Sequence, residues 1–189
     1  MGLKALSPGG RTGHITAGHC HPNSPAEFNP FPESFYGDID GRRISFNLDD
    51  EWIGNGVDAQ LHQTVESGDS SLAYYHDGSR SVPIYSTANV YPRSGDYYCF
   101  YGRASNLFQC GCVAVGTRSS GVYGSPFYAI LSSGRGPLVK TGDSGGPVVM
   151  GNEAKGIIHA YDANTGDMLF NDVQSMREKT GLKFYAIVR

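Results

Sequence analysis

Short runs of β-branched and aromatic residues, separated by turn-forming residues, constrain the fold of this chain more than any other feature. Five such runs lie at residues 43–47, 81–85, 112–115, 127–131 and 156–160. Residues of these types favour strands, and many short strands between turn signals favour a barrel or a sandwich. The 26 glycines and 10 prolines supply the turns. The chain is therefore expected to be all-β.

A single segment near the C-terminus is predicted to be helical. Asp172 can cap its start, Val173 and Met176 follow at helical spacing, and Gly181 can end it. Residues 183–188 then have the pattern of a terminal strand.

Turn-forming residues also divide the chain. Residues 22–32 are predicted to form a surface loop, and Gly, Ser, Asp and Pro gather at about 67–92. We interpret the second segment as a linker between two β units, an N-terminal one at 1–75 and a C-terminal one at 76–189.

The charge pattern argues against several partners. The formal net charge is −3 without long runs of either sign, so no basic patch for nucleic acid is expected. No apolar stretch approaches the roughly 20 residues that span a bilayer. The N-terminus lacks the apolar segment of a signal peptide. Either processing segments are absent from this chain, or it is cytoplasmic.

Four cysteines, Cys20, Cys99, Cys110 and Cys112, allow three fully paired connectivities. Cys99 and Cys110 flank a turn-rich loop, which suits a disulfide between two strands worth roughly 3 kcal/mol. Two short segments, 19–21 and 110–112, contain five candidate zinc ligands but lack the gap of two to four residues usual for structural zinc. No metal site is predicted.

Gly142-Asp-Ser-Gly-Gly-Pro147 is the most specific segment of the sequence. Ser144 has the setting of a nucleophile that attacks a carbonyl, and the backbone N–H groups of Gly142 and Ser144 would face the oxygen that becomes negative. Gly145 and Gly146 permit a sharp turn. The alternative is an ordinary turn between strands.

A serine nucleophile needs a histidine base held by a buried acid. His19 follows a predicted strand end and has small neighbours, which would let its ring project into a cleft. Asp58 starts an alternating strand, whereas Asp49 and Asp50 lie in a plainer polar stretch. The order His, Asp, Ser is one of three known orders for such a triad. We predict His19, Asp58 and Ser144 as the triad.

These segments resemble the chymotrypsin-like serine proteases, above all the bacterial branch of the streptogrisins and alpha-lytic protease. The resemblance rests on residues 16–20, 58–61 and 142–147 and extends from Arg11 onward, and the loop at 99–110 is similar to a disulfide loop of that branch. It implies two packed antiparallel β-barrels with the active site between them. It also implies a secreted, monomeric serine endopeptidase that acts on polypeptides without a cofactor.

The N-terminal end departs from the family pattern. Only 18 residues precede His19, where the family has further strands and a cysteine partner for the position of Cys20. One expectation is therefore a first barrel that lacks its initial strands. Cys20 would be unpaired or bonded to Cys112.

A second departure concerns the acid before the nucleophile. In the bacterial branch a basic residue pairs with it, but Phe100 holds that position here. Because an unpaired buried carboxylate is costly, Asp143 is expected to find Arg103 or backbone donors instead.

By resemblance, two segments would bind the substrate. Ile158, His159, Ala160 and Tyr161 would pair with an extended peptide, and Leu138, Val139, Lys140 and Thr141 would form a wall of the specificity pocket.

No acidic residue occurs where trypsin-like enzymes carry theirs, so a preference for Lys or Arg is not expected. The role of His159 has two interpretations. It lines the pocket and binds an acidic side chain, as a histidine does in the glutamyl endopeptidases, or it contacts Asp58 or solvent.

Two other functional classes stay open. One is a catalytically impaired homologue that binds peptides or proteins, which missing N-terminal strands would favour. The other is an unrelated β-domain in which the motifs coincide by chance.

Overall fold

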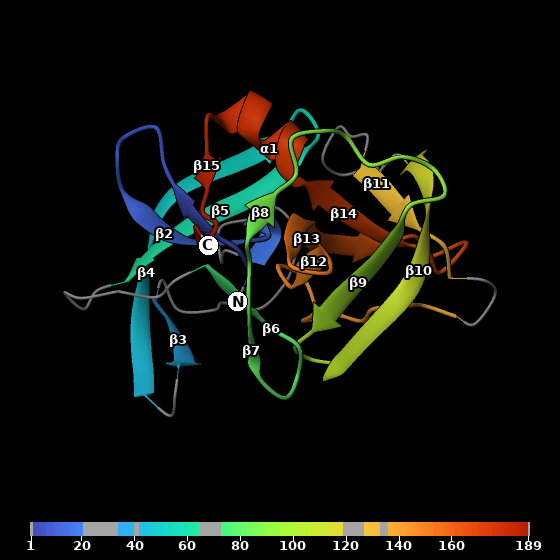
Figure 1. Ribbon diagram of the computed structural model, residues 1–189, viewed down its shortest axis with the longest axis horizontal. Coiled ribbons are helices and arrows are strands. Elements are labelled where there is room, and N and C mark those ends of the chain that lie inside the picture. The colour runs from blue at the N-terminus through green and yellow to red at the C-terminus, as the bar shows by residue number, and fades with distance from the viewer. Residues whose placement is uncertain are drawn as a thin grey trace.

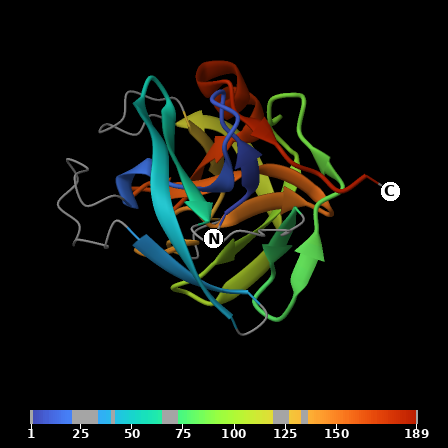
Figure 2. The same ribbon diagram turned by 90° about the vertical axis from the view of Figure 1, so that its left-hand side faces the viewer.

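The computed structural model describes residues 2–20, 34–39, 42–64, 73–118, 127–132 and 136–188. Its strands form two large sheets that lie beside one another, and a small two-stranded hairpin (Figure 1). The view in Figure 2 looks onto the first sheet, with the second behind it. The predicted surface loop at 22–32 lies outside the described residues.

The first sheet has the strand order β15-β1-β2-β5-β4-β3, and all its neighbours are antiparallel. Its strands are β1 (Lys4–Leu6), β2 (Thr12–Thr16), β3 (Ser34–Ile39), β4 (Arg42–Gly54), β5 (Val57–Thr64) and β15 (Lys183–Phe184). Two strands thus precede His19. The terminal strand is shorter than the predicted 183–188.

The second sheet closes into a six-stranded barrel. The order β12-β9-β10-β11-β14-β13 returns to its start because β13 also pairs with β12, and β8 adds to β13 in parallel. The strands are β8 (Ser86–Thr87), β9 (Tyr97–Gly102), β10 (Leu107–Arg118), β11 (Phe127–Ile130), β12 (Pro147–Met150), β13 (Glu153–Tyr161) and β14 (Met168–Asp172).

The expected all-β class and C-terminal barrel are confirmed. Among the described strands of the first sheet, no pairing joins β15 to β3, so closure of the first barrel stays a prediction.

The predicted linker contains strands of its own. The hairpin of β6 (Tyr74–His76) and β7 (Ser81–Pro83) and the short strand β8 lie within 67–92. The proposed boundary between residues 75 and 76 falls inside β6. The division into two β units remains a prediction.

The predicted helix is confirmed as α1 (Val173–Thr180). Asp172 caps it by accepting a hydrogen bond from the Ser175 N–H at 2.8 Å. Gly181 ends it at φ 75°, a left-handed conformation that glycine adopts without strain. In the described part of the chain, no helix has the length and the apolar character needed to cross a membrane.

One apolar core joins the two sheets. Residues of the first sheet such as Ile15 and Leu61 pack in the same buried cluster as Val149 and Ile157 of the barrel and Met176 of α1. Burial of apolar surface in a shared core holds the two sheets against each other. Residues at the ends of strands from both sheets are thereby brought together.

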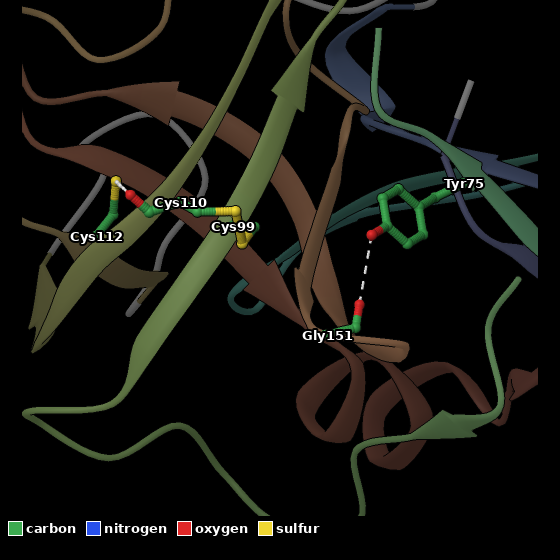
Figure 3. Close-up of a disulfide and its surroundings, with 5 residues drawn as sticks. All are labelled: Tyr75, Cys99, Cys110, Cys112 and Gly151. Carbon is green, nitrogen blue, oxygen red and sulfur yellow. Dashed lines mark hydrogen bonds between the residues drawn. A yellow bond between two sulfur atoms is a disulfide. The ribbon is translucent and has the colours of Figure 1, made fainter. Parts of the chain in front are cut away.

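The predicted disulfide between Cys99 and Cys110 is confirmed and joins β9 to β10 (Figure 3). Tyr75 of the β6–β7 hairpin donates to the Gly151 carbonyl of the barrel at 3.4 Å in the same view. Cys20 and Cys112 take no part in a disulfide, which rules out the bond between them that was considered from the sequence.

Candidate active site

Three polar residues meet where the two sheets face each other. His19 lies in a single 3-10 turn (Gly18–Cys20) directly after β2, and Asp58 is the second residue of β5. Ser144 lies in the turn before β12. The sequence therefore places each side chain at a strand end, where a side chain can reach a neighbouring sheet.

These residues form a continuous line of hydrogen bonds. The His19 Nδ1 atom lies 2.6 Å from Asp58 Oδ2, and its Nε2 atom lies 2.8 Å from Ser144 Oγ. The His19 side chain is 18% exposed and Asp58 is fully buried. The ring can thus meet a molecule from solvent, while the carboxylate is shielded from water.

Backbone and side-chain donors surround the Asp58 carboxylate. Its Oδ1 atom accepts the backbone N–H of His19 at 2.8 Å, and its Oδ2 atom accepts from the rings of His19 and His159. Burial raises the pKa of Asp58, but the hydrogen bonds from His159 and His19 outweigh it and hold the pKa well below its ordinary value. Asp58 is therefore a carboxylate at neutral pH.

The backbone around Asp58 is fixed by two residues that sequence reasoning missed. Asn171 of β14 accepts the Asp58 N–H through its side-chain oxygen at 2.7 Å, which ties the barrel to β5. Gln60, two residues along β5, donates to the Gly18 carbonyl at 2.6 Å and to Glu51 at 2.7 Å. Both are buried amides, so each lost bond would leave an unpaired polar group.

The Ser144 turn needs glycine at two positions. Gly142 has φ 92° and Gly145 has φ 81°, in the left-handed region that other residues avoid. A Cβ atom at Gly145 would also collide with Thr16 of the neighbouring sheet. Within the described residues, the N–H groups of Gly142 and Ser144 have no protein acceptor. They are thus available to a ligand oxygen.

The side chain of Asp143 stabilises the same turn. Its carboxylate accepts the backbone N–H groups of Ser105 at 2.8 Å and of Lys140 at 2.9 Å. Of the two partners considered, backbone donors rather than Arg103 fill this role. The expectation that Asp143 has a partner is confirmed.

The two segments predicted to bind substrate flank Ser144. Gly145 donates to the Ile158 carbonyl and Ile158 donates to the Gly146 carbonyl, both at 2.8 Å, so β13 runs beside the turn. Leu138, Val139, Ile158 and His159 are buried, Ala160 is half-buried, and Lys140, Thr141 and Tyr161 are exposed. Their role in substrate binding stays a prediction.

His159 makes one of the contacts considered from the sequence. Its Nδ1 atom lies 2.6 Å from Asp58 Oδ2, and the residue is 1% exposed. The ring stacks on Phe127, with the centroids 4.0 Å apart. Of the alternatives named for His159, the structure shows the contact with Asp58.

The ring nitrogens of His19 and His159 and the Asp58 carboxylate lie within 4.8 Å of one another, close enough for a metal site. Both nitrogen–oxygen distances, however, are 2.6 Å. Ligand atoms on a tetrahedral zinc at about 2.0–2.1 Å lie about 3.3 Å apart. The arrangement fits two hydrogen bonds with a proton in each.

Several solved structures with a similar fold are serine proteases. A glutamic acid specific serine protease, which uses a histidine triad in substrate binding, matches with a TM-score of 0.71 and 17% identity over 97% of this chain and 91% of its own. Nocardiopsis protease matches with a TM-score of 0.65 and 19% identity over 98% of this chain and 91% of its own. Cellulomonas bogoriensis chymotrypsin matches with a TM-score of 0.62 and 20% identity over 99% of this chain and 90% of its own.

No protein-family model and no curated protein sequence matches the chain. At identities of 20% or less, the similarity to solved structures establishes the fold rather than the activity. The chain therefore has the chymotrypsin-like fold found in these bacterial serine proteases.

Proposed function

We propose that this protein is a serine endopeptidase that hydrolyses peptide bonds through an acyl-enzyme intermediate. The observation that carries the proposal is the unbroken line of hydrogen bonds from Ser144 Oγ through the His19 ring to the buried Asp58. In this arrangement a weakly acidic hydroxyl lies beside a base whose charged form a carboxylate stabilises.

In the first half of the reaction, His19 Nε2 takes the proton of Ser144 while Oγ attacks the substrate carbonyl. The bond from carbon to the leaving nitrogen then breaks, and the same ring gives its proton to that nitrogen. In the second half a water molecule gives a proton to His19 and attacks the ester carbon. The bond from that carbon to Ser144 Oγ then breaks, and His19 returns the proton to Oγ. Asp58 holds Nδ1 as the donor throughout and stays ionised.

The oxygen that becomes negative would be held by the backbone N–H groups of Gly142 and Ser144. No described residue accepts a hydrogen bond from either group, which supports this role. In serine proteases, the loss of one donor to this oxygen raises the barrier by about 2.7–4 kcal/mol. Asp143 supports the geometry indirectly because its bonds to Ser105 and Lys140 fix the turn.

The substrate would be an extended polypeptide that lies along residues 158–161 of β13, with 138–141 beside the cut residue. Exposed Tyr161 and half-buried Ala160 leave part of this strand accessible. A secreted location agrees with the Cys99–Cys110 disulfide, because such bonds persist in oxidising surroundings. A monomer that needs no cofactor is proposed with it.

Labelling with a fluorophosphonate probe tests the proposal. The protein should label with one probe per chain, Ser144→Ala should not label, and Ser94→Ala, which changes an exposed turn serine, should label as the parent does. Cleavage of a peptide library then shows the residue preferred before the cut. A folded protein that binds peptides but neither labels nor cleaves would instead be a catalytically impaired homologue.

A further inference from the structure

A second imidazole reaches the acid of the proposed triad. His159 Nδ1 and His19 Nδ1 each lie 2.6 Å from the same atom, Asp58 Oδ2. The two rings are nearly perpendicular, with an interplanar angle of 80° and centroids 5.5 Å apart. One carboxylate oxygen is thus shared between a ring in the turn after β2 and a ring on β13.

The surroundings of His159 fix its ring. It lies on β13, is 1% exposed, and stacks on Phe127 at an interplanar angle of 11°. Its backbone carbonyl oxygen also lies 3.0 Å from Ser144 Oγ. The same residue therefore contacts the acid through its side chain and the nucleophile through its backbone.

The chemistry of the shared oxygen assigns the protons. An ionised carboxylate only accepts hydrogen bonds, so Nδ1 of each ring carries a hydrogen. His19 uses its Nε2 atom toward Ser144. Each ring that donates to Oδ2 takes part of the negative charge that would otherwise stabilise the charged form of the other ring.

We propose that His159 is a positioning residue: it holds the Asp58 carboxylate in place for His19 and, by sharing Oδ2, makes His19 a weaker base. This inference rests on the proposed peptidase function. It assigns His159 to the interior of the site rather than to the substrate pocket. The expected consequence is activity that persists to a lower pH than with an unshared carboxylate.

Two variants separate this role from simple packing. His159→Phe keeps the ring volume and the stacking on Phe127 but removes the donor, whereas His159→Asn carries an amide N–H near the position of Nδ1. The measurement is kcat/KM against pH with a peptide substrate.

For His159→Phe we expect the acidic limb of the curve of kcat/KM against pH to move to higher pH by about half to one unit. We also expect kcat to fall about tenfold, because Asp58 is less firmly held. His159→Asn should return the limb to within about 0.2 units of the parent, since it restores the donor. A merely structural role would lower kcat in proportion to the folded fraction and leave the limb in place. An acidic limb at the same pH in the parent and both variants would overturn the proposal.

A readout without activity keeps the inference separate from the proposed function. In a Ser144→Ala background, proton NMR should show two strongly downfield Nδ1–H resonances, and the added His159→Phe change should remove one. A single such resonance in Ser144→Ala, assigned to His19, overturns the sharing of Asp58 even if no variant of His159 folds. Failure of probe labelling with two resonances present would reject the peptidase function alone.

Discussion

Removal of the Cys99–Cys110 disulfide should destabilise the protein by a predictable amount and leave the site intact. The bond closes a segment with a sequence separation of 11. In the chain-entropy model, a cross-link over a loop of this length lowers the entropy of the unfolded chain enough to contribute about 2.8 kcal/mol at 25 °C. The double variant Cys99→Ser/Cys110→Ser should lose that free energy of unfolding.

The site should tolerate the change because other contacts hold the same hairpin. Backbone pairs such as Leu107 with Gly102 and Phe108 with Tyr101 continue the ladder between β9 and β10 beside the turn. That turn provides the Ser105 N–H that Asp143 accepts. The rate of fluorophosphonate labelling at 25 °C should therefore stay within about twofold of the parent, a difference of about 0.4 kcal/mol in barrier.

Urea unfolding followed by fluorescence measures the loss, and the parent protein under reducing conditions is the matched control. The double variant and the reduced parent should unfold at the same midpoint. A loss under about 1 kcal/mol would refute the entropic reasoning. A tenfold fall in labelling rate in a folded variant would show instead that the bond positions the turn.

Three other perturbations test buried contacts. Asn171→Leu leaves the Asp58 N–H without an acceptor and should cost about 1–3 kcal/mol in urea unfolding, whereas Asn164→Leu, at an exposed position, should stay within about 0.5 kcal/mol. Because the pKa of Asp58 is lower in the folded than in the unfolded protein, the unfolded chain binds its proton first as the pH falls. The urea concentration at the unfolding midpoint should therefore fall as the pH is lowered below about 4, and Asp58→Asn should make this fall smaller. Gly95 has φ 94° and open space around it, so Gly95→Ala should lower the free energy of unfolding only by the roughly 1–2 kcal/mol of left-handed strain. Gly145→Ala should lower it clearly more and abolish probe labelling, because its Cβ also collides with the first sheet. Equal losses of unfolding free energy in the two variants would contradict the collision.

Features set by neighbouring residues could be predicted from the sequence. The helix ends follow from Asp172 and Gly181, whose side chain and backbone freedom act within one turn. The disulfide follows from two cysteines on either side of a short loop. The motif residues His19, Asp58 and Ser144 were recognised by type and order, and the structure brings them within hydrogen-bond distance.

Contacts between distant segments could not be predicted in the same way. No local pattern shows that Asn171 accepts from Asp58, because the bond depends on how β14 meets β5. The long strand β4 was predicted only at 43–47, since its polar residues around Asp49 and Asp50 break the alternation. The structure accommodates them with an irregularity between Leu48 and Asp50.

The pairing of β1 with β15 has a consequence for how the site comes to exist. Ala5 lies opposite Phe184, so the sheet that carries His19 and Asp58 takes its outermost strand from the last residues of the described chain. A ribosome must therefore have passed residue 184 before that sheet can be complete. Contacts of such long sequence separation are slow to form, and we expect the two halves of the site to mature together, late in folding.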